Sequence, residues 1–327
     1  MVRQLDRQLG FLVSVNALII LAALVLVGTS FTGLFNLQSM GAQVPELGLL
    51  ALGVALAMIS GNGGIDLSGI ALANLSGVIA VLLTPYVATA DAAPLAYTLT
   101  FAAIALLTGL AGGAVNGCLI GFAGLTPIIA TLGTQLLFTG LAVGLTGGSA
   151  QPLGFILPMD DFGNMPYLGV PLPFALFIGL AAILALVLRF TGFGKRLFLM
   201  GSNPTAAFFA GIPVKRMLFV TYMLSGVLAS VAGFVIAART SSVKWDYGTS
   251  YVLIAILTVV MAGVRPSGGY GRILCVVLSA IALQMLSSLF NFMNISNFFR
   301  DCAWGLLLIL FLATSRIDLQ PYLRARN

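Results

Sequence analysis

The run LGFLVSVNALIILAALVLVG, residues 9–28, decides how the rest of the sequence is interpreted. It contains no charged residue, and a helix of about 20 apolar residues crosses the roughly 30 Å hydrocarbon core of a bilayer. Arg3 and Arg7 precede it, but the run is longer than the core of a signal peptide and lacks a convincing small-x-small cleavage site nearby. We therefore predict a retained first membrane span.

The composition extends this prediction to the whole chain of 327 residues. The chain is 60% hydrophobic and only 7% charged, whereas about 25% of the residues in a soluble domain are charged. Its 38 glycines are small enough to let membrane helices pack closely. It has no histidine, and Cys118, Cys275 and Cys302 stand singly in apolar segments, which argues against a metal site or a disulfide framework. The composition therefore predicts a polytopic membrane protein, and the net charge of +6 gives no indication of nucleic-acid binding.

Ten apolar runs are long enough to be considered as membrane spans. Several are short or interrupted by glycine, and the third, eighth and tenth have the least defined ends. The runs lie at about residues 9–30, 44–60, 67–88, 95–122, 126–147, 171–190, 216–238, 251–264, 272–290 and 301–315. We predict an all-α fold with about ten transmembrane helices in a single domain over residues 1–327, and with both termini in the cytoplasm.

The distribution of positive charge sets the orientation of these spans. If the N-terminus is cytoplasmic and all ten runs cross, all but three of the 15 Lys and Arg lie in cytoplasmic segments, as the positive-inside rule expects. Arg239, Lys244 and Arg300 are the three external cations, and Glu46 is one of the acids that fall on the external side. These cations are candidates for steering an incoming partner protein, with chance surface charge as the alternative. The longest connections are then an external loop at residues 148–170 and a cytoplasmic loop at 191–215.

The cytoplasmic loop contains the sequence GSNPTAAFFAGIPVKR, residues 201–216. Ser202 or Asn203 can cap a helix that begins at Pro204, Gly211 suits its C-terminal end, and Pro213 prevents it from continuing. A helix of about two turns is marginal unless other contacts hold it. Phe208 and Phe209 can anchor this helix to its own membrane domain or to a partner, while Ala206, Ala207 and Ala210 keep one surface small. The alternative is an interfacial helix that lies among the lipid headgroups.

Asp66, within GNGGIDLSG, is an acid close to a membrane span on the side away from the external loops. Gly61, Gly63 and Gly64 are expected to break the helix there, so that Asp66 and Ser68 cap the next helix. The alternatives are a direct role in gating or in binding substrate hydroxyls, and a proton-coupling carboxylate, for which no second intramembrane acid or histidine offers a relay partner.

Neutral polar side chains form a second series on and before the fourth and fifth spans. Their hydroxyl and amide groups suit an uncharged, polyhydroxylated molecule better than an ion, although such groups often serve only as hydrogen-bond partners between helices. The series comprises Asn116, Thr126, Thr131, Thr134 and Gln135. The candidate residues for a translocation path or gate are Asn62, Asp66, Ser68, Asn116, Thr131 and Thr134.

Four stretches, taken in order, carry a resemblance to a known family. SGNGGIDLS (Ser60–Ser68) is similar to an S-G-G-I-D-L-S signature, and Gly109–Gly148 resembles G-x-x-x-G-x-x-N-G followed by P-x-I-x-T-L-G-T. Gly201–Arg216 resembles a coupling-helix segment, G-x-N-x-x-A-A-x-x-A-G-I, and SGGYG (Ser267–Gly271) resembles a cytoplasmic S-G-G-x-G turn. Together these stretches resemble the ABC importer permeases of the ribose and monosaccharide type over nearly the whole chain.

This resemblance implies a permease subunit of a bacterial inner membrane, which imports a small neutral sugar or sugar-like polyol. Its partners would be a second permease subunit, two ATP-binding domains and an external solute-binding protein. The short cytoplasmic helix would fit a groove of the ATP-binding subunit, through Gly201, Asn203, Pro204, Ala206, Ala207, Ala210, Gly211 and Ile212. The sequence has no G-x-x-x-x-G-K-[ST] phosphate loop, so we expect no cofactor or ATPase site on this chain, and ATP on a partner.

Two other classes of protein are weighed against this one. An ion-coupled secondary transporter of a small neutral solute would need no partner subunits. An intramembrane enzyme is disfavoured, because the sequence has no histidine, no paired membrane acids and no plausible activated nucleophile.

Overall fold

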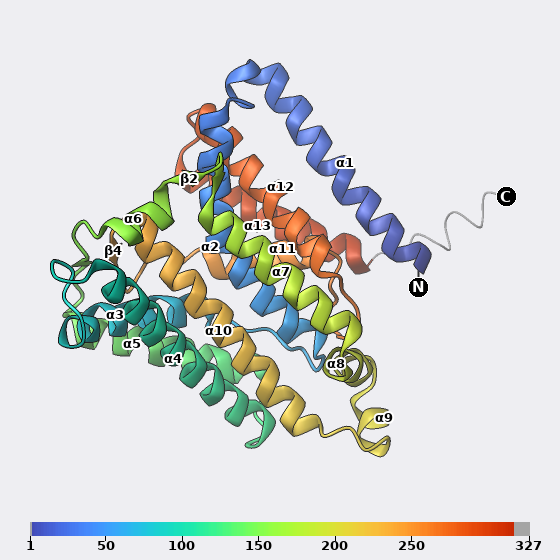
Figure 1. Cartoon of the computed structure of the whole chain (residues 1–327). Coiled ribbons are helices and arrows are strands. Elements are labelled where there is room, and N and C mark those ends of the chain that lie inside the picture. Colours follow the sequence, from blue (N-terminus) through green and yellow to red (C-terminus); the bar gives the residue numbers. More distant parts are fainter. Residues whose placement is uncertain (1, 317–327) are drawn as a thin grey trace.

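The computed structural model describes residues 2–316, and helices dominate it (Figure 1). Two short antiparallel strand pairs join β1 (Gln151–Pro152) to β4 (Ser242–Val243) and β2 (Pro166–Tyr167) to β3 (Val170–Pro171). The helices are α1 (Val2–Leu26), α2 (Leu34–Ile59), α3 (Gly69–Leu83), α4 (Pro94–Gly121), α5 (Pro127–Thr146), α6 (Leu157–Asn164), α7 (Leu172–Phe190), α8 (Gly192–Ser202), α9 (Pro204–Phe209), α10 (Val214–Thr240), α11 (Tyr251–Met261), α12 (Ile273–Phe292) and α13 (Asn297–Arg316).

Eight helices in the described part of the chain are long and apolar enough to cross a membrane: α1, α2, α3, α4, α5, α7, α10 and α12. Of the two remaining predicted spans, the tenth corresponds to α13 and the eighth to α11, which has only 11 residues. At 1.5 Å per residue α11 is about 17 Å long, roughly half of the hydrocarbon core. The predicted all-α polytopic fold is confirmed, with α11 as a half-length helix. The predicted cytoplasmic C-terminus, with Arg324 and Arg326, lies outside the described residues.

The centre of the bundle is built from α2 and α10. The most apolar stretch of α2 is 89% buried, and α10 packs against α2, α3 and α4. The contact between α4 and α10 follows a stripe of glycines four residues apart, which includes Gly113 and Gly117. A Cβ atom at these two positions would lie 2.6 and 2.7 Å from backbone oxygens of α10. The two backbones are therefore in contact, which is the close approach that small residues permit in membranes.

Segments predicted on one side of the membrane lie together in the structure. At one end of the bundle, β1 after α5 pairs with β4 after α10, and α6 packs on α10. At the other end lie α8 and α9 (Figure 1), and Gln8 donates a hydrogen bond of 2.8 Å from Nε2 to the carbonyl of Met261. The external loop predicted at 148–170 is not irregular, because it contains α6 and three short strands, and the cytoplasmic loop at 191–215 contains two helices, α8 and α9.

Candidate translocation path and coupling segment

The segment between α2 and α3, residues 60–68, folds back along α2 without helical structure. Gly61, Asn62 and Gly63 all have positive φ, at 83°, 56° and 67°, a conformation that glycine adopts freely and asparagine tolerates. A Cβ atom at Gly64 would lie 2.1 Å from the carbonyl oxygen of Ala57, so the returning chain lies directly on α2. The predicted break at these glycines is thus present, and Asn62 lies in its exposed turn, away from the other candidate path residues.

The returning segment carries Asp66 into the bundle, where only 3% of this residue is exposed. Its Oδ1 accepts hydrogen bonds from the Ser68 backbone N–H at 3.0 Å and from the Ser68 hydroxyl at 2.7 Å. Its Oδ2 accepts a bond of 2.6 Å from the hydroxyl of Ser225 on α10. Ser68 precedes the first residue of α3 and makes no capping bond with its own side chain. Asp66 therefore holds the start of α3 and also ties it to α10.

Four further candidates continue from this carboxylate as one buried polar cluster. Asn116 on α4 donates from Nδ2 to the Ser68 hydroxyl at 2.8 Å, and Thr134 on α5 donates to Asn116 Oδ1 at 2.6 Å. Thr131 on α5 donates to the carbonyl of Ile65 at 3.1 Å. The structure thus joins Asp66, Ser68, Asn116, Thr131 and Thr134, with Asn62 outside the cluster.

Two members of this site lie on α10 and were not predicted. Ser225 is one, and Tyr222, one turn earlier, is fully buried with a hydroxyl that has no hydrogen-bond partner in the described part of the chain. A single serine or tyrosine in an apolar helix carries no signal in the sequence. Ser225 binds Asp66 directly, and Tyr222 packs against Ile120 of α4 and Ala130 of α5, the two helices that carry Asn116 and Thr134.

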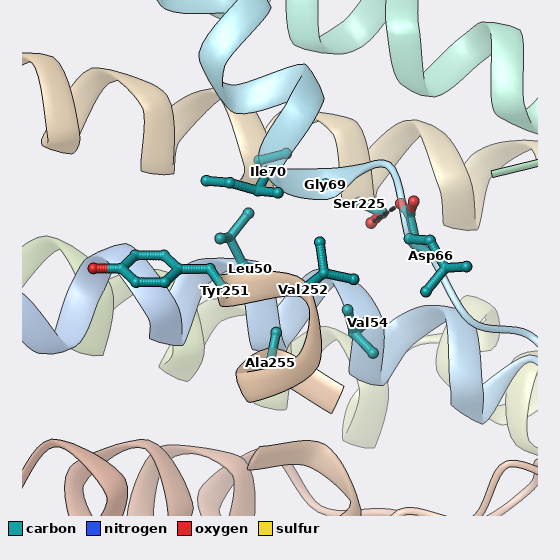
Figure 2. Close-up of a pocket in the computed structure, with 11 residues that line it drawn as sticks. Leu50, Val54, Asp66, Gly69, Ile70, Ser225, Tyr251, Val252 and Ala255 are labelled. Atoms are coloured by element: carbon teal, nitrogen blue, oxygen red, sulfur yellow. Dashed lines mark hydrogen bonds between the residues drawn. The ribbon is translucent and has the colours of Figure 1, made fainter. Parts of the chain in front are cut away.

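A narrow cavity lies beside Asp66 and Ser225, between α2, α10 and the starts of α3 and α11 (Figure 2). Its walls are largely hydrocarbon, from side chains that include Leu50, Val54 and Val252. Its volume is about 10 Å³, roughly the space of one water molecule. Backbone that is not helical is tolerated at this depth only inside protein or along a water-filled cavity. Residues 60–68, which precede α3, and the start of α11 both reach this cavity. The path is therefore closed in this conformation.

Glu46, predicted on the external side, is buried in α2 with only 1% of its surface exposed. Its carboxylate pairs with Arg239 Nε at 2.6 Å and accepts bonds from the hydroxyls of Tyr247 and Tyr251 at 3.0 and 3.1 Å. Burial and the neighbouring Glu46 raise the pKa of Tyr247 to about 12, so its hydroxyl stays protonated as a donor. Asn74 on α3 binds the same loop through the carbonyls of Trp245 and Tyr247. This Glu46 cluster holds residues 241–250 over the external side of the bundle.

The predicted docking cations have different surroundings. Arg239 points inward to Glu46, with 18% of its side chain exposed, and so does not offer a free charge to a partner. Arg300 donates to Asn291 Oδ1 and to the Ser287 hydroxyl on α12. Lys244 is 52% exposed and lies 3.9 Å from Asp246. Of the three, Lys244 is the most available to another protein.

The coupling segment has the local structure predicted for it. Asn203 Oδ1 accepts a hydrogen bond of 2.9 Å from the N–H of Ala206, Pro204 begins α9, and Gly211 follows with φ of 75°. Ala206 and Ala210 are exposed, whereas the third predicted small residue, Ala207, is only 3% exposed. Phe208 and Phe209 are 68% and 82% exposed, which leaves them available to a partner, one of the two anchoring roles predicted for them. Ala207 therefore packs on its own chain, and the aromatic pair is presented outward.

Backbones from three segments meet where the coupling segment joins the bundle. Gly201 at the end of α8 lies against the end of α2, where its Cβ would be 2.0 Å from the carbonyl oxygen of Ile59. Gly269 donates a hydrogen bond of 3.0 Å to that same oxygen, and Gly268 lies against Gly61. We call Gly61, Gly201, Gly268 and Gly269 the glycine junction. The glycine junction brings the end of α8 into direct contact with two other segments: residues 60–68, which carry Asp66, and the turn that follows α11.

Apolar spans around a buried polar cluster, with a non-helical segment and the half-length helix α11 beside it, define a polytopic membrane permease. The chain belongs to the family of permease components of transport systems described as branched-chain amino acid transport system / permease component, whose model matches residues 9–313. Autoinducer 2 import system permease proteins are similar to it. The protein from Photorhabdus temperata is 32% identical over 84% of this chain and 81% of its own length. The protein from Yersinia enterocolitica is 30% identical over 93% of this chain and 92% of its own length. The ribose import permease protein of Bacillus subtilis is 31% identical over 95% of this chain and 93% of its own.

No solved structure matches the chain significantly. The family and its members confirm the resemblance to ABC importer permeases, so the chain is a multi-pass permease subunit of a bacterial membrane importer.

Proposed function

We propose that this chain forms the translocation path of an ATP-driven importer for a small neutral sugar or sugar-like polyol. Similar permeases are named for ribose and autoinducer 2 import. Asp66 and Ser225 line the closed cavity, and the hydroxyl and amide groups of Ser68, Asn116 and Thr134 continue from Asp66 as one buried cluster. Such groups pair with the hydroxyls of an uncharged solute. A branched-chain amino acid, in the family's description, would require groups for its two charges.

The single observation that carries the coupling part of the proposal is the exposed face of α9. Two large aromatic side chains, Phe208 and Phe209, lie together there with ring centroids 5.7 Å apart. Aromatic residues that are exposed together are typical of binding sites for other proteins. We assign this face to an ATP-binding subunit, which binds the ATP in place of this chain. The complete importer then has two permease subunits, identical or related in sequence, and each of them docks one ATP-binding domain. Movement of α9 then reaches Asp66 through α8 and the glycine junction.

The external side of the proposed assembly receives a solute-binding protein. Lys244 is its candidate contact, because its ammonium group is exposed within residues 241–250, the loop that the Glu46 cluster holds in place. Release of the solute there would require this loop to move away from α2.

The experiment compares the double variant Phe208→Ala, Phe209→Ala with the control Tyr86→Ala. The control also removes an exposed aromatic side chain, because Tyr86 is 88% exposed, but at the opposite end of the helix bundle. Each chain is reconstituted with its ATP-binding and solute-binding partners, and sugar uptake and ATP hydrolysis are measured together. We expect the double variant to insert normally but to lose binding of the ATP-binding subunit and ATP-driven uptake, while Tyr86→Ala keeps both. Uptake by the double variant at the native rate would refute docking on this face. Gradient-driven uptake by the purified chain alone would favour the ion-coupled transporter instead.

A further inference from the structure

A second and larger cavity lies between the first turns of α2 and the last turns of α12, apart from the Asp66 cluster. Its volume is about 230 Å³, against about 10 Å³ for the cavity beside Asp66. Six of its lining side chains are neutral and polar, and none of the residues that line it is charged: Asn36, Ser39, Gln43, Gln284, Ser288 and Asn291. We call it the amide pocket.

The side chains of the amide pocket are already arranged by bonds among themselves. Gln284 donates from Nε2 to Gln43 Oε1 at 3.0 Å, Gln43 donates to the Ser39 hydroxyl at 3.0 Å, and Ser288 donates to Asn36 Oδ1 at 2.9 Å. A carboxamide can donate two hydrogen bonds and accept two, so Gln43 and Gln284 each keep a donor and an acceptor for a ligand. Asn36 keeps only an acceptor, because its amide donates to the carbonyl of Phe31 and to Met40 Sδ. The pocket is therefore ordered, and it can still donate hydrogen bonds to the hydroxyl groups of a ligand and accept bonds from them.

The position of the pocket is on the external half of the bundle. Both helix ends that form it lead to external segments, and Gln38 on α2 donates to the carbonyl of Gly169 in the external loop at 3.2 Å. Polar side chains inside a membrane are costly unless they face protein or a water-filled space. A cluster of amides here is best accounted for by an aqueous entrance that opens to the outside.

The amide pocket and the closed cavity lie along one face of α2. Residues 36, 39 and 43 line the first, and 50 and 54 line the second, at the three-, four- and seven-residue spacings that keep side chains on one side of a helix. Glu46 lies between them in the sequence and anchors residues 241–250. A solute in the amide pocket therefore lies on the external side of the Glu46 cluster, and Asp66 lies beyond it.

We propose that the amide pocket is an external binding site for uncharged, polyhydroxylated solutes, which occupy it before they reach the cavity beside Asp66. This inference rests on the proposed import function for its direction, but the binding that it asserts can be measured separately. The lining groups are neutral amides and hydroxyls, and Arg300, which contacts one of them, already donates to Asn291 Oδ1 and to the Ser287 hydroxyl. An ion in the pocket would therefore lose its hydration without meeting an oppositely charged lining residue.

The test uses Ser39→Cys in a full-length chain whose Cys118, Cys275 and Cys302 are replaced by alanine, assembled with its partners in right-side-out vesicles. A membrane-impermeant methanethiosulfonate reagent reports on access from outside. We expect modification of the introduced thiol, slowed by D-ribose or myo-inositol and not by D-gluconate. Adding Gln284→Leu should weaken the protection by about two- to tenfold, the range for one lost neutral hydrogen bond. As a control, Ser279→Cys, at a buried position on α12, the helix of Gln284, should stay unmodified.

Three results would overturn the proposal: no modification of Ser39→Cys from outside, as when a second subunit covers the pocket; equal rates with and without the neutral solutes; or equal protection by gluconate. ATP-driven uptake in the same vesicles separates the two claims. Uptake without protection leaves the import function standing and removes the amide pocket, whereas protection without ATP-driven uptake does the opposite.

Discussion

Gly201→Ala tests whether the glycine junction transmits movement from the coupling segment. The φ of Gly201 lies outside the left-handed region, so alanine is strained there only by what its Cβ meets. That atom would be 2.0 Å from the carbonyl oxygen of Ile59 and 2.5 Å from the backbone nitrogen of Gly269. Since both neighbours are backbone atoms, no change of rotamer can make room, and α8 must move away from both segments.

The size of the effect follows from two opposing contributions. Alanine in place of glycine within a helix stabilises by about 0.5–1 kcal/mol, and overpacking typically costs about 1–3 kcal/mol. Because two rigid backbones are displaced, we expect the upper part of that cost and a net destabilisation of about 2 kcal/mol. Gly192→Ala is the matched control on the same helix, because a Cβ at Gly192 meets nothing within 4 Å.

The assay measures ATP hydrolysis and solute uptake by the complete importer in proteoliposomes, together with thermal unfolding of the purified chain. Linked sites are typically coupled by about 1–3 kcal/mol, so we expect Gly201→Ala to lower the solute imported per ATP by about tenfold, and Gly192→Ala to leave it unchanged. A Gly201→Ala chain that assembles, hydrolyses ATP and imports as much solute per ATP as the native chain would refute transmission through the junction.

Three further predictions follow from contacts inside the bundle. Asp66→Asn keeps an acceptor for Ser68 and can pair with Ser225 through its amide, so the variant should fold, retain uptake and show the pH profile of the native chain; a flattened profile in a pH-dependent uptake assay would instead indicate proton coupling. Glu46→Gln removes one partner of a largely buried ion pair, and because Arg239 is partly exposed we expect a loss of about 2–3 kcal/mol, below the roughly 3–5 kcal/mol for fully buried pairs; native thermal stability would contradict this. Gly113→Leu should separate α4 from α10 and prevent stable folding, seen as aggregation in size-exclusion chromatography, whereas a monodisperse native-like profile would show that the helix contact can yield.

The sequence was sufficient for features that depend on neighbouring residues. The spans follow from runs of apolar residues, and the ends of α9 follow from Asn203, Pro204 and Gly211, which act within one turn of the helix. The same holds for the break before Asp66, because glycines set it locally. Each of these features is decided by side chains and backbone within a few positions of one another.

Features that depend on the packing of distant segments were missed. Ser225 is 159 residues from Asp66, and Gln284 is 241 residues from Gln43, so no local pattern connects either pair. The burial of Ala207 was missed for the same reason, because it depends on how α9 packs against α8 and α10. A helix as short as α9 has no long periodic pattern that could reveal its buried side.

The glycine stripe between α4 and α10 restricts how the bundle can change shape. Helices whose backbones touch along several turns cannot slide past one another without collision, so α4 and α10 must move as one rigid body. Asn116 and Ser225 lie on these two helices, and their separation is therefore preserved during a transport cycle. If the path opens beside Asp66, it must therefore open by a displacement of the segment that carries Asp66, or of α2, relative to the α4 and α10 pair, and the hydrogen bond between Asp66 and Ser225 is a contact that such a displacement would break.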